Sequence, residues 1–123
     1  MLTEVRKEKL VKLCQELIRN PSVSGQEDKV VEAIKKVFKE FNFDEYFVDS
    51  YGNIIGHIKG KGPGKTILFD GHIDHVPVTD EQKWKFGPFC GEIAEGRIYG
   101  RGTSDMKGQV SAMITAASYF AED

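Results

Sequence analysis

One segment of the chain places an imidazole beside a carboxylate in a pattern suited to binding a metal ion. His72 and Asp74 lie two positions apart after an apolar run, so an extended backbone points both to the same side. A metal-bound histidine commonly donates its second ring N–H to a carboxylate, which fixes its tautomer and strengthens it as a ligand. The spacing therefore predicts that the Asp74 carboxylate accepts a hydrogen bond from the His72 ring and orients it. The alternative is an ordinary surface turn.

A second segment places one aspartate in a glycine-rich loop before a predicted helix. Asp105 lies within the stretch GRGTSDMKG at positions 100–108, and glycine allows a backbone to approach a bound group closely. The alternative is that Asp105 or Ser104 caps the helix. The loop matches neither GxxxxGK[ST] nor GxGxxG, so the sequence gives little support to a phosphate site.

Apolar periodicity predicts three helices around these segments. The first spans Thr3 to Arg19, because Pro21 blocks its continuation, and the third begins at Gln109. The second follows a loop in which Ser24 and the glutamate three positions later have the spacing of a capping box. Its buried stripe is predicted to contain Val30, Ile34, Val37, Phe38 and Phe41.

A change to period two predicts strands. Residues 43–48 and 54–59 form one hairpin around a turn at 50–53, and residues 92–94 and 97–99 form a second around Glu95-Gly96. The uninterrupted apolar run Thr66–Phe69 predicts a central strand that is covered on both faces. These elements predict an α/β fold with helices against a mixed sheet. Ligands of such folds bind at the carboxyl ends of strands, where both unusual segments are expected.

Taken together, the motifs resemble the M20 family of metallopeptidases, which includes aminoacylases, acetylornithine deacetylase, succinyl-diaminopimelate desuccinylase and glutamate carboxypeptidases. The resemblance covers nearly the whole chain, and in detail it is similar to the YgeY-like hydrolases linked to selenium metabolism. The stretches of this chain that carry the resemblance are PSVSGQE at 21–27, YGN at 51–53, GHIDHVP at 71–77, Trp84 with Pro88-Phe89 and Gly91-Glu92-Ile93, and GRGTSDMKG at 100–108.

The resemblance implies a partial zinc-peptidase-like catalytic domain of a metal-dependent amidohydrolase. It implies that His72 binds one of two zinc ions, that Asp105 bridges both, and that Asp74 acts in catalysis by orienting His72. Cobalt or manganese could replace zinc. A pair of metal ions would activate water for attack on an amide bond of a peptide or a small N-acyl amino acid.

Members of the family take a general base and further metal ligands from later residues, beginning with two adjacent glutamates. They also carry a smaller lid domain that often forms a homodimer. This chain has no Glu-Glu pair and ends at Asp123, so we expect residues 1–123 to be the N-terminal part of a hydrolase, inactive alone. The alternative is a non-catalytic truncated module that keeps the fold for binding or scaffolding. An aspartate- or serine-based hydrolase without metal is disfavoured because no nucleophile elbow such as GxSxG is present.

The remaining histidines receive structural interpretations. His75 departs from the family pattern, and alternation points it away from His72 and Asp74, which favours a packing or solvent-facing role. His57 lies in a predicted strand and is interpreted as structural.

Aromatic and basic side chains near the two segments offer further candidates. Trp84, Phe86 and Phe89 could wall a substrate cleft, although loop aromatics more often pack the loop down. Arg101 and Lys107 could bind a substrate carboxylate, and solvated surface charge is the expected role of both.

Composition argues against several classes of function. The net charge of -2 comes from acidic and basic residues mixed along the chain, so no basic stripe predicts nucleic-acid binding. No apolar run is long enough for a signal peptide or a membrane span, so we expect no membrane partner. Cys14 and Cys90 lack metal or redox spacing and are expected to be buried, reduced thiols of a cytoplasmic protein.

Overall fold

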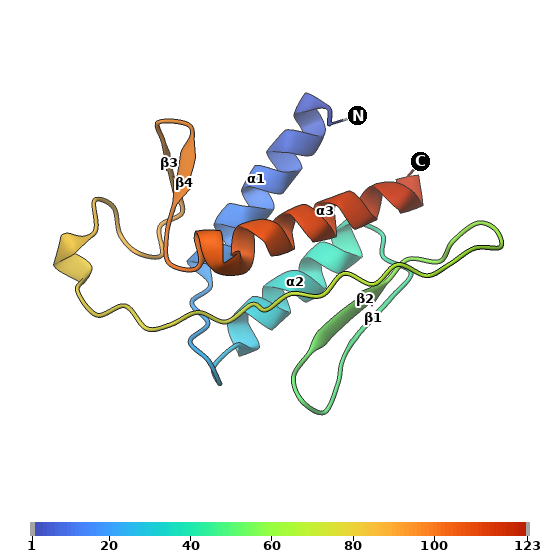
Figure 1. Ribbon diagram of the computed structural model, residues 1–123, viewed down its shortest axis with the longest axis horizontal. Helices are drawn as coiled ribbons and strands as arrows, with labels where there is room; N and C mark the ends of the chain where they lie inside the picture. The colour runs from blue at the N-terminus through green and yellow to red at the C-terminus, as the bar shows by residue number, and fades with distance from the viewer. Residues whose placement is uncertain (1, 123) are drawn as a thin grey trace.

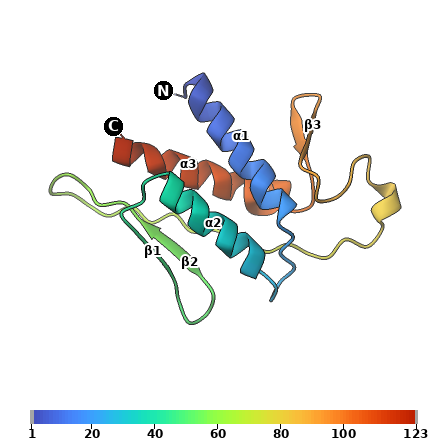
Figure 2. The same ribbon diagram turned by 180° about the vertical axis from the view of Figure 1, so that it is seen from behind.

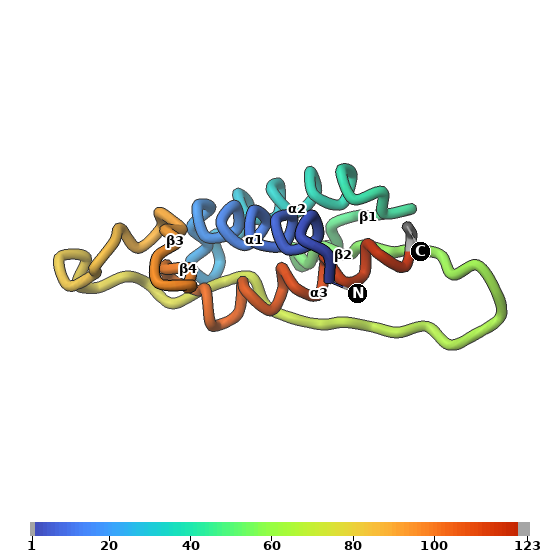
Figure 3. The backbone as a smooth tube through the Cα atoms, turned by 90° about the horizontal axis from the view of Figure 1, so that it is seen from above, coloured from blue at the N-terminus to red at the C-terminus, as the bar shows by residue number. Residues whose placement is uncertain are grey.

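A computed structural model describes residues 2–122. Its helices are α1 (Glu4–Arg19), α2 (Asp28–Glu40) and α3 (Gly108–Glu122). Helices α1 and α2 form one layer, and α3 lies across them together with a long extended segment between residues 58 and 80 (Figures 1, 2 and 3). The three helices share one apolar core, to which α1 contributes Leu13 and Leu17 and α3 contributes Val110 and Ile114.

Helix α1 has the boundaries that its sequence predicts. Thr3 is its N-cap, and the Thr3 hydroxyl accepts a hydrogen bond from the Arg6 amide at 3.3 Å. Glu4 in the first turn and Arg19 in the last turn carry the charges that suit the helix dipole. The helix ends before Pro21, as expected.

Helix α2 confirms the predicted stripe and corrects the predicted cap. All five stripe residues are buried: Val30, Ile34, Val37, Phe38 and Phe41. The capping box is wrong, because Glu27 is itself the N-cap, without a side-chain cap bond. The Glu27 carboxylate instead accepts from the Gly25 amide at 2.7 Å, and the Ser24 hydroxyl donates to Asp74. Ser24 thus contacts a distant segment rather than the helix.

Both predicted hairpins are confirmed, and each is antiparallel. Strand β1 (Glu45–Val48) pairs with β2 (Ile54–His57), and β3 (Glu92–Ala94) pairs with β4 (Arg97–Tyr99). The turn of the second hairpin falls at Glu95 and Gly96, which have φ values of 55° and 72°. The two hairpins lie at opposite ends of the molecule (Figures 1 and 2).

The predicted mixed sheet and its central strand are wrong for the described residues. The hairpins form two separate two-stranded sheets, and no strand is assigned to 66–69. Ile67, Leu68 and Phe69 are 68%, 86% and 50% exposed instead of covered on both faces. A strand requires backbone partners on a neighbouring strand, and none of the described residues supplies them to this segment. The α/β character is therefore confirmed, but the sheet architecture is not.

Two further sequence expectations concern burial. Both cysteines are free; Cys14 is buried as expected, whereas Cys90 is only half-buried. Between residues 2 and 122, no helix combines the length and the apolar character that crossing a bilayer would require.

Candidate metal centre

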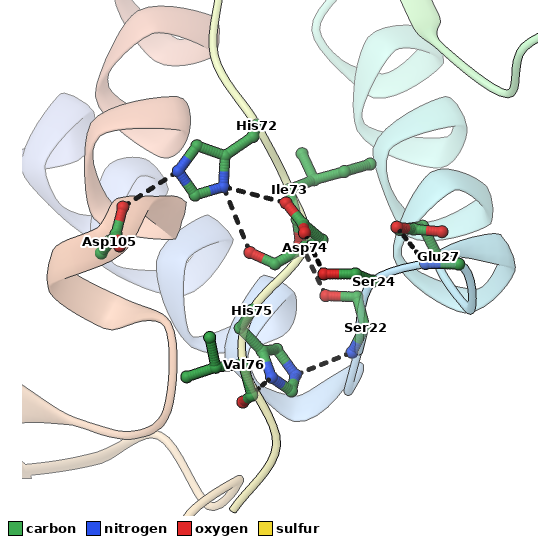
Figure 4. Close-up of polar contacts among 10 residues, drawn as sticks. Ser22, Ser24, Glu27, His72, Ile73, Asp74, His75, Val76 and Asp105 are labelled. Carbon is green, nitrogen blue, oxygen red and sulfur yellow. Dashed lines mark hydrogen bonds and ion pairs between the residues drawn. The ribbon is translucent and has the colours of Figure 1, made fainter.

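The side chains of His72, Asp74 and Asp105 come together as predicted, although they belong to two distant segments. Nε2 of His72 lies 2.9 Å from Oδ1 of Asp105, and Nδ1 of His72 lies 3.1 Å from Oδ1 of Asp74 (Figure 4). The imidazole is therefore bracketed by two carboxylates. The expected alternation along residues 72–75 is confirmed, because His75 points away from this group.

Asp105 lies in a tight turn that joins β4 to α3. A kinked turn at Thr103–Lys107, in which Asp105 and Met106 have non-helical backbone angles, follows Gly102, whose φ of 80° favours glycine. At the start of this loop, a Cβ on Gly100 would lie 2.4 Å from Cγ2 of Ile18. The loop therefore packs directly on α1, and glycine is required at that contact.

Lys107 anchors the same turn, and its predicted solvated role is wrong. The side chain is fully buried, and Nζ donates hydrogen bonds to the carbonyl oxygens of Leu17 and Asn20, at 2.8 and 2.9 Å. These carbonyls belong to the C-terminal end of α1, where a cation is favourable. Burial lowers the pKa of Lys107 to about 8, against an opposing effect of Cys14. The hydrogen bonds of Lys107 therefore hold the turn that contains Asp105 against the C-terminal end of α1.

The His72–Asp74 segment is held from its other side by the loop at residues 21–25. Val23 forms a parallel bridge with His75, and the His75 amide donates to the Ser22 carbonyl at 2.9 Å. The Ser22 hydroxyl donates to the Ile73 carbonyl at 2.6 Å. Figure 4 shows the bond between Ser22 and Ile73. Two loops far apart in sequence therefore fix the extended segment that carries His72.

The electrostatics of the group favour a cation. Partial desolvation lowers the pKa of His72. The hydrogen bonds that the Asp105 carboxylate and the Asp74 carbonyl accept from its ring, together with the charges of both aspartates, outweigh this effect, so the net shift is upward. The hydrogen bond from Ser24 holds the pKa of Asp74 below its ordinary value, with a smaller contribution from His72. A carboxylate therefore faces each ring nitrogen, and a proton or a metal ion at Nε2 would be stabilised.

The donor types fit zinc, while the described residues supply only part of a site. Two ligands of one tetrahedral zinc ion lie about 3.3 Å apart, given bond lengths of about 2.0–2.2 Å. Nε2 of His72 and Oδ1 of Asp105 are 2.9 Å apart, so the two atoms would have to move only slightly further apart to bind one zinc ion. The Asp105 side chain is 89% exposed, which leaves it room for this movement. Within residues 2–122, no group of three or more His, Cys, Asp or Glu side chains could hold a metal. Further ligands would have to come from elsewhere.

His75 has a packing role, as predicted, and the solvent-facing alternative is wrong. It is 4% exposed, and its Nε2 accepts from the Ser22 amide at 2.9 Å. Its ring centroid lies 5.4 Å from that of Phe89. Ser22 and Ser24 also support the site, a role that the sequence did not predict; their only signal was the stretch PSVSGQE among the family-like motifs.

The other aromatic and basic candidates form packing contacts. Phe86 packs edge-on against Tyr99 at 4.9 Å between centroids, and the half-buried Arg101 stacks its guanidinium over Trp84 at 5.0 Å. His57 lies at the end of β2, half-exposed, with Nδ1 3.8 Å from a Glu45 oxygen. None of these contacts involves His72, Asp74 or Asp105, so they favour a structural role.

Comparison with known families identifies the segment that carries the candidate site. The model of peptidase family M20/M25/M40 matches residues 68–123, a range that contains His72, Asp74 and Asp105.

Similar proteins extend the match toward the N-terminus. Succinyl-diaminopimelate desuccinylases from Cereibacter sphaeroides strains ATCC 17029 and KD131 are each 39% identical over 115 residues, or 92% of this chain. The chain spans 30% of the length of these relatives. An M20 family metallo-carboxypeptidase from Sulfolobus solfataricus matches with a TM-score of 0.77 and 25% identity, over 93% of this chain and 27% of that one. The likeness to the selenium-linked hydrolases stays a prediction.

Proposed function

Because this chain belongs to peptidase family M20/M25/M40, we propose that residues 1–123 form the N-terminal part of the catalytic domain of a metal-dependent amide hydrolase. The observation that carries the proposal is the approach of His72 Nε2 to Asp105 Oδ1 at 2.9 Å, across 33 positions of sequence. Two ligands of one metal centre must converge in this way, and both residues lie in stretches that resemble the family, which favours a metal site over an ordinary surface ion pair.

Each side chain has a distinct part in the proposal. His72 would present the Nε2 lone pair to a metal ion, and Asp105 would offer carboxylate oxygens to two ions. Asp74 would accept the Nδ1–H of His72 and keep that ring in the ligating tautomer. When bound, two zinc ions, or cobalt or manganese in their place, would activate water and polarise the scissile carbonyl.

The proposed substrate is a peptide or an N-acyl amino acid. The relatives named as succinyl-diaminopimelate desuccinylases make an N-succinyl amine the first compound to assay. The residues that choose among acyl groups are proposed to lie outside this chain, which spans 30% of those relatives. A cytoplasmic location and a homodimeric full-length protein belong to the same proposal.

The test compares alanine variants in the full-length protein. His72→Ala and Asp105→Ala should each lower bound zinc, measured by elemental analysis, and reduce amidase activity at least about 100-fold. His57→Ala, which removes a half-exposed imidazole elsewhere, is the matched control and should retain both. Wild-type metal content and full activity in both site variants would refute the assignment.

A further inference from the structure

The loop at residues 21–25 joins α1 to α2 and also forms several hydrogen bonds with the extended segment at residues 73–75. Ser22 is fully buried, and its amide, hydroxyl and carbonyl each bond to the segment at 73–75. His75, 4% exposed, takes part in two of these bonds: its ring Nε2 accepts from the Ser22 amide, and its own amide donates to the Ser22 carbonyl. This clamp fixes the next residues of the loop against the same segment (Figure 4).

Ser24, two residues beyond the clamp, reaches the side chain of Asp74. Its hydroxyl donates to Oδ2 of Asp74, while Oδ1 of the same carboxylate faces Nδ1 of His72 at 3.1 Å. A carboxylate held at only one oxygen can rotate about its Cβ–Cγ bond, since that torsion is broad. Bonds at both oxygens remove this freedom. Oδ1 is thereby aimed at the imidazole.

Ser24 is suited to a test because it is exposed and contributes nothing to the core. Its hydroxyl donates a hydrogen bond to Asp74. Loss of the hydroxyl would therefore free the carboxylate without creating a cavity. Its effect on His72 can be separated from an effect on folding.

We propose that Ser24 is a positioning residue, whose hydroxyl orients Asp74 and, through Asp74, fixes the ring of His72 for metal binding. The proposal rests on the proposed function for its metal-binding consequence. Its geometric part, the orientation of His72 by way of Asp74, stands on the hydrogen bonds alone. The two parts therefore need separate measurements.

The first measurement is zinc affinity of the full-length protein, by competition with a chromogenic chelator. Ser24→Ala should weaken zinc binding about five-fold, the value of one ordinary hydrogen bond. Asp74→Ala should weaken it by about 10–100-fold, as expected for the partner of a metal-bound histidine. Ser24→Thr keeps a hydroxyl and should restore affinity. Ser50→Ala, at an exposed turn serine, is the matched control.

A double-mutant cycle separates positioning from a general structural effect. If Ser24 acts through Asp74, adding Ser24→Ala to Asp74→Ala should change zinc affinity by less than about two-fold. Additive losses would overturn the proposal, because Ser24 would then act by another route. So would a Ser24→Ala protein that binds zinc as tightly as wild type.

The second measurement needs no metal. The ¹⁵N chemical shifts of the His72 ring in the metal-free protein report how its protons are shared between Nδ1 and Nε2. Ser24→Ala should move these shifts in the same direction as Asp74→Ala, and Ser50→Ala should leave them unchanged. Unchanged shifts in Ser24→Ala would refute the positioning role. If wild type bound no zinc while these shifts moved, the proposed function would fail and the orientation of His72 by Ser24 would stand.

Discussion

The burial of Lys107 leads to a prediction about stability that involves no catalysis. Lys107→Met keeps an unbranched side chain of similar length but removes the donor to the Leu17 and Asn20 carbonyls, 2.8 and 2.9 Å away. Two acceptors that lose their donor cost about 1–3 kcal/mol each. The lowered pKa of about 8 corresponds to a cost of about 3 kcal/mol for burying the ammonium, which methionine avoids. The two carbonyls together would lose about 2–6 kcal/mol, so the expected net loss at pH 7 is at most about 3 kcal/mol.

The same burial gives a pH signature with a definite sign. The pKa of Lys107 is about 8 in the folded protein and 10.5 without the fold, so between these values the unfolded chain binds more protons. Stability contributed by this group therefore rises as pH increases from about 8 to 10.5. Lys107→Met should lack the rise. Cys14, whose pKa is raised by burial, has the opposite effect. The Lys107 charge lowers the pKa of Cys14, so Lys107→Met should strengthen this opposite effect and widen the difference further.

The assay is urea unfolding of the full-length protein, followed by circular dichroism at pH 7 and at several values up to pH 10. Lys65→Met is the matched control, because Lys65 is exposed, and it should match wild type throughout. The difference between wild type and Lys107→Met should widen with pH. If Lys107→Met were as stable as Lys65→Met at pH 7 and the gap stayed constant, the anchoring role of Lys107 would be refuted.

Three further predictions concern packing and metal. Gly100→Ala would place a methyl group 2.4 Å from Ile18 Cγ2 and should cost at least about 1–3 kcal/mol in thermal unfolding, whereas Gly64→Ala, with open space around it, should be nearly neutral. Chelation should abolish amidase activity of the full-length protein, and zinc should restore it; activity that persists in demonstrably metal-free protein would contradict this. Residues 1–123 alone should show no turnover above background, and a zinc-dependent rate from pure material would disprove that.

Local patterns along the chain predicted the helices, the hairpins and one half of the site. A helix or a hairpin depends on spacing within a few residues, so the stripe of α2 and the turn at Glu95-Gly96 could be predicted directly. The pairing of His72 with Asp74 follows from the two-residue period of an extended backbone. The convergence of His72 and Asp105 was predicted only by resemblance to a family, since no local rule joins residues 33 positions apart.

Tertiary structure alone decided where the polar supporting residues point. Ser24 has the spacing of a helix cap and Lys107 the type of a surface cation, yet one bonds to Asp74 and the other is buried against the end of α1. The run Thr66–Phe69 has a strand composition but no strand partner among the described residues. A residue's type fixes which bonds it can form. Which partner it finds depends on the segments that packing brings beside it, and short-range spacing does not contain that information.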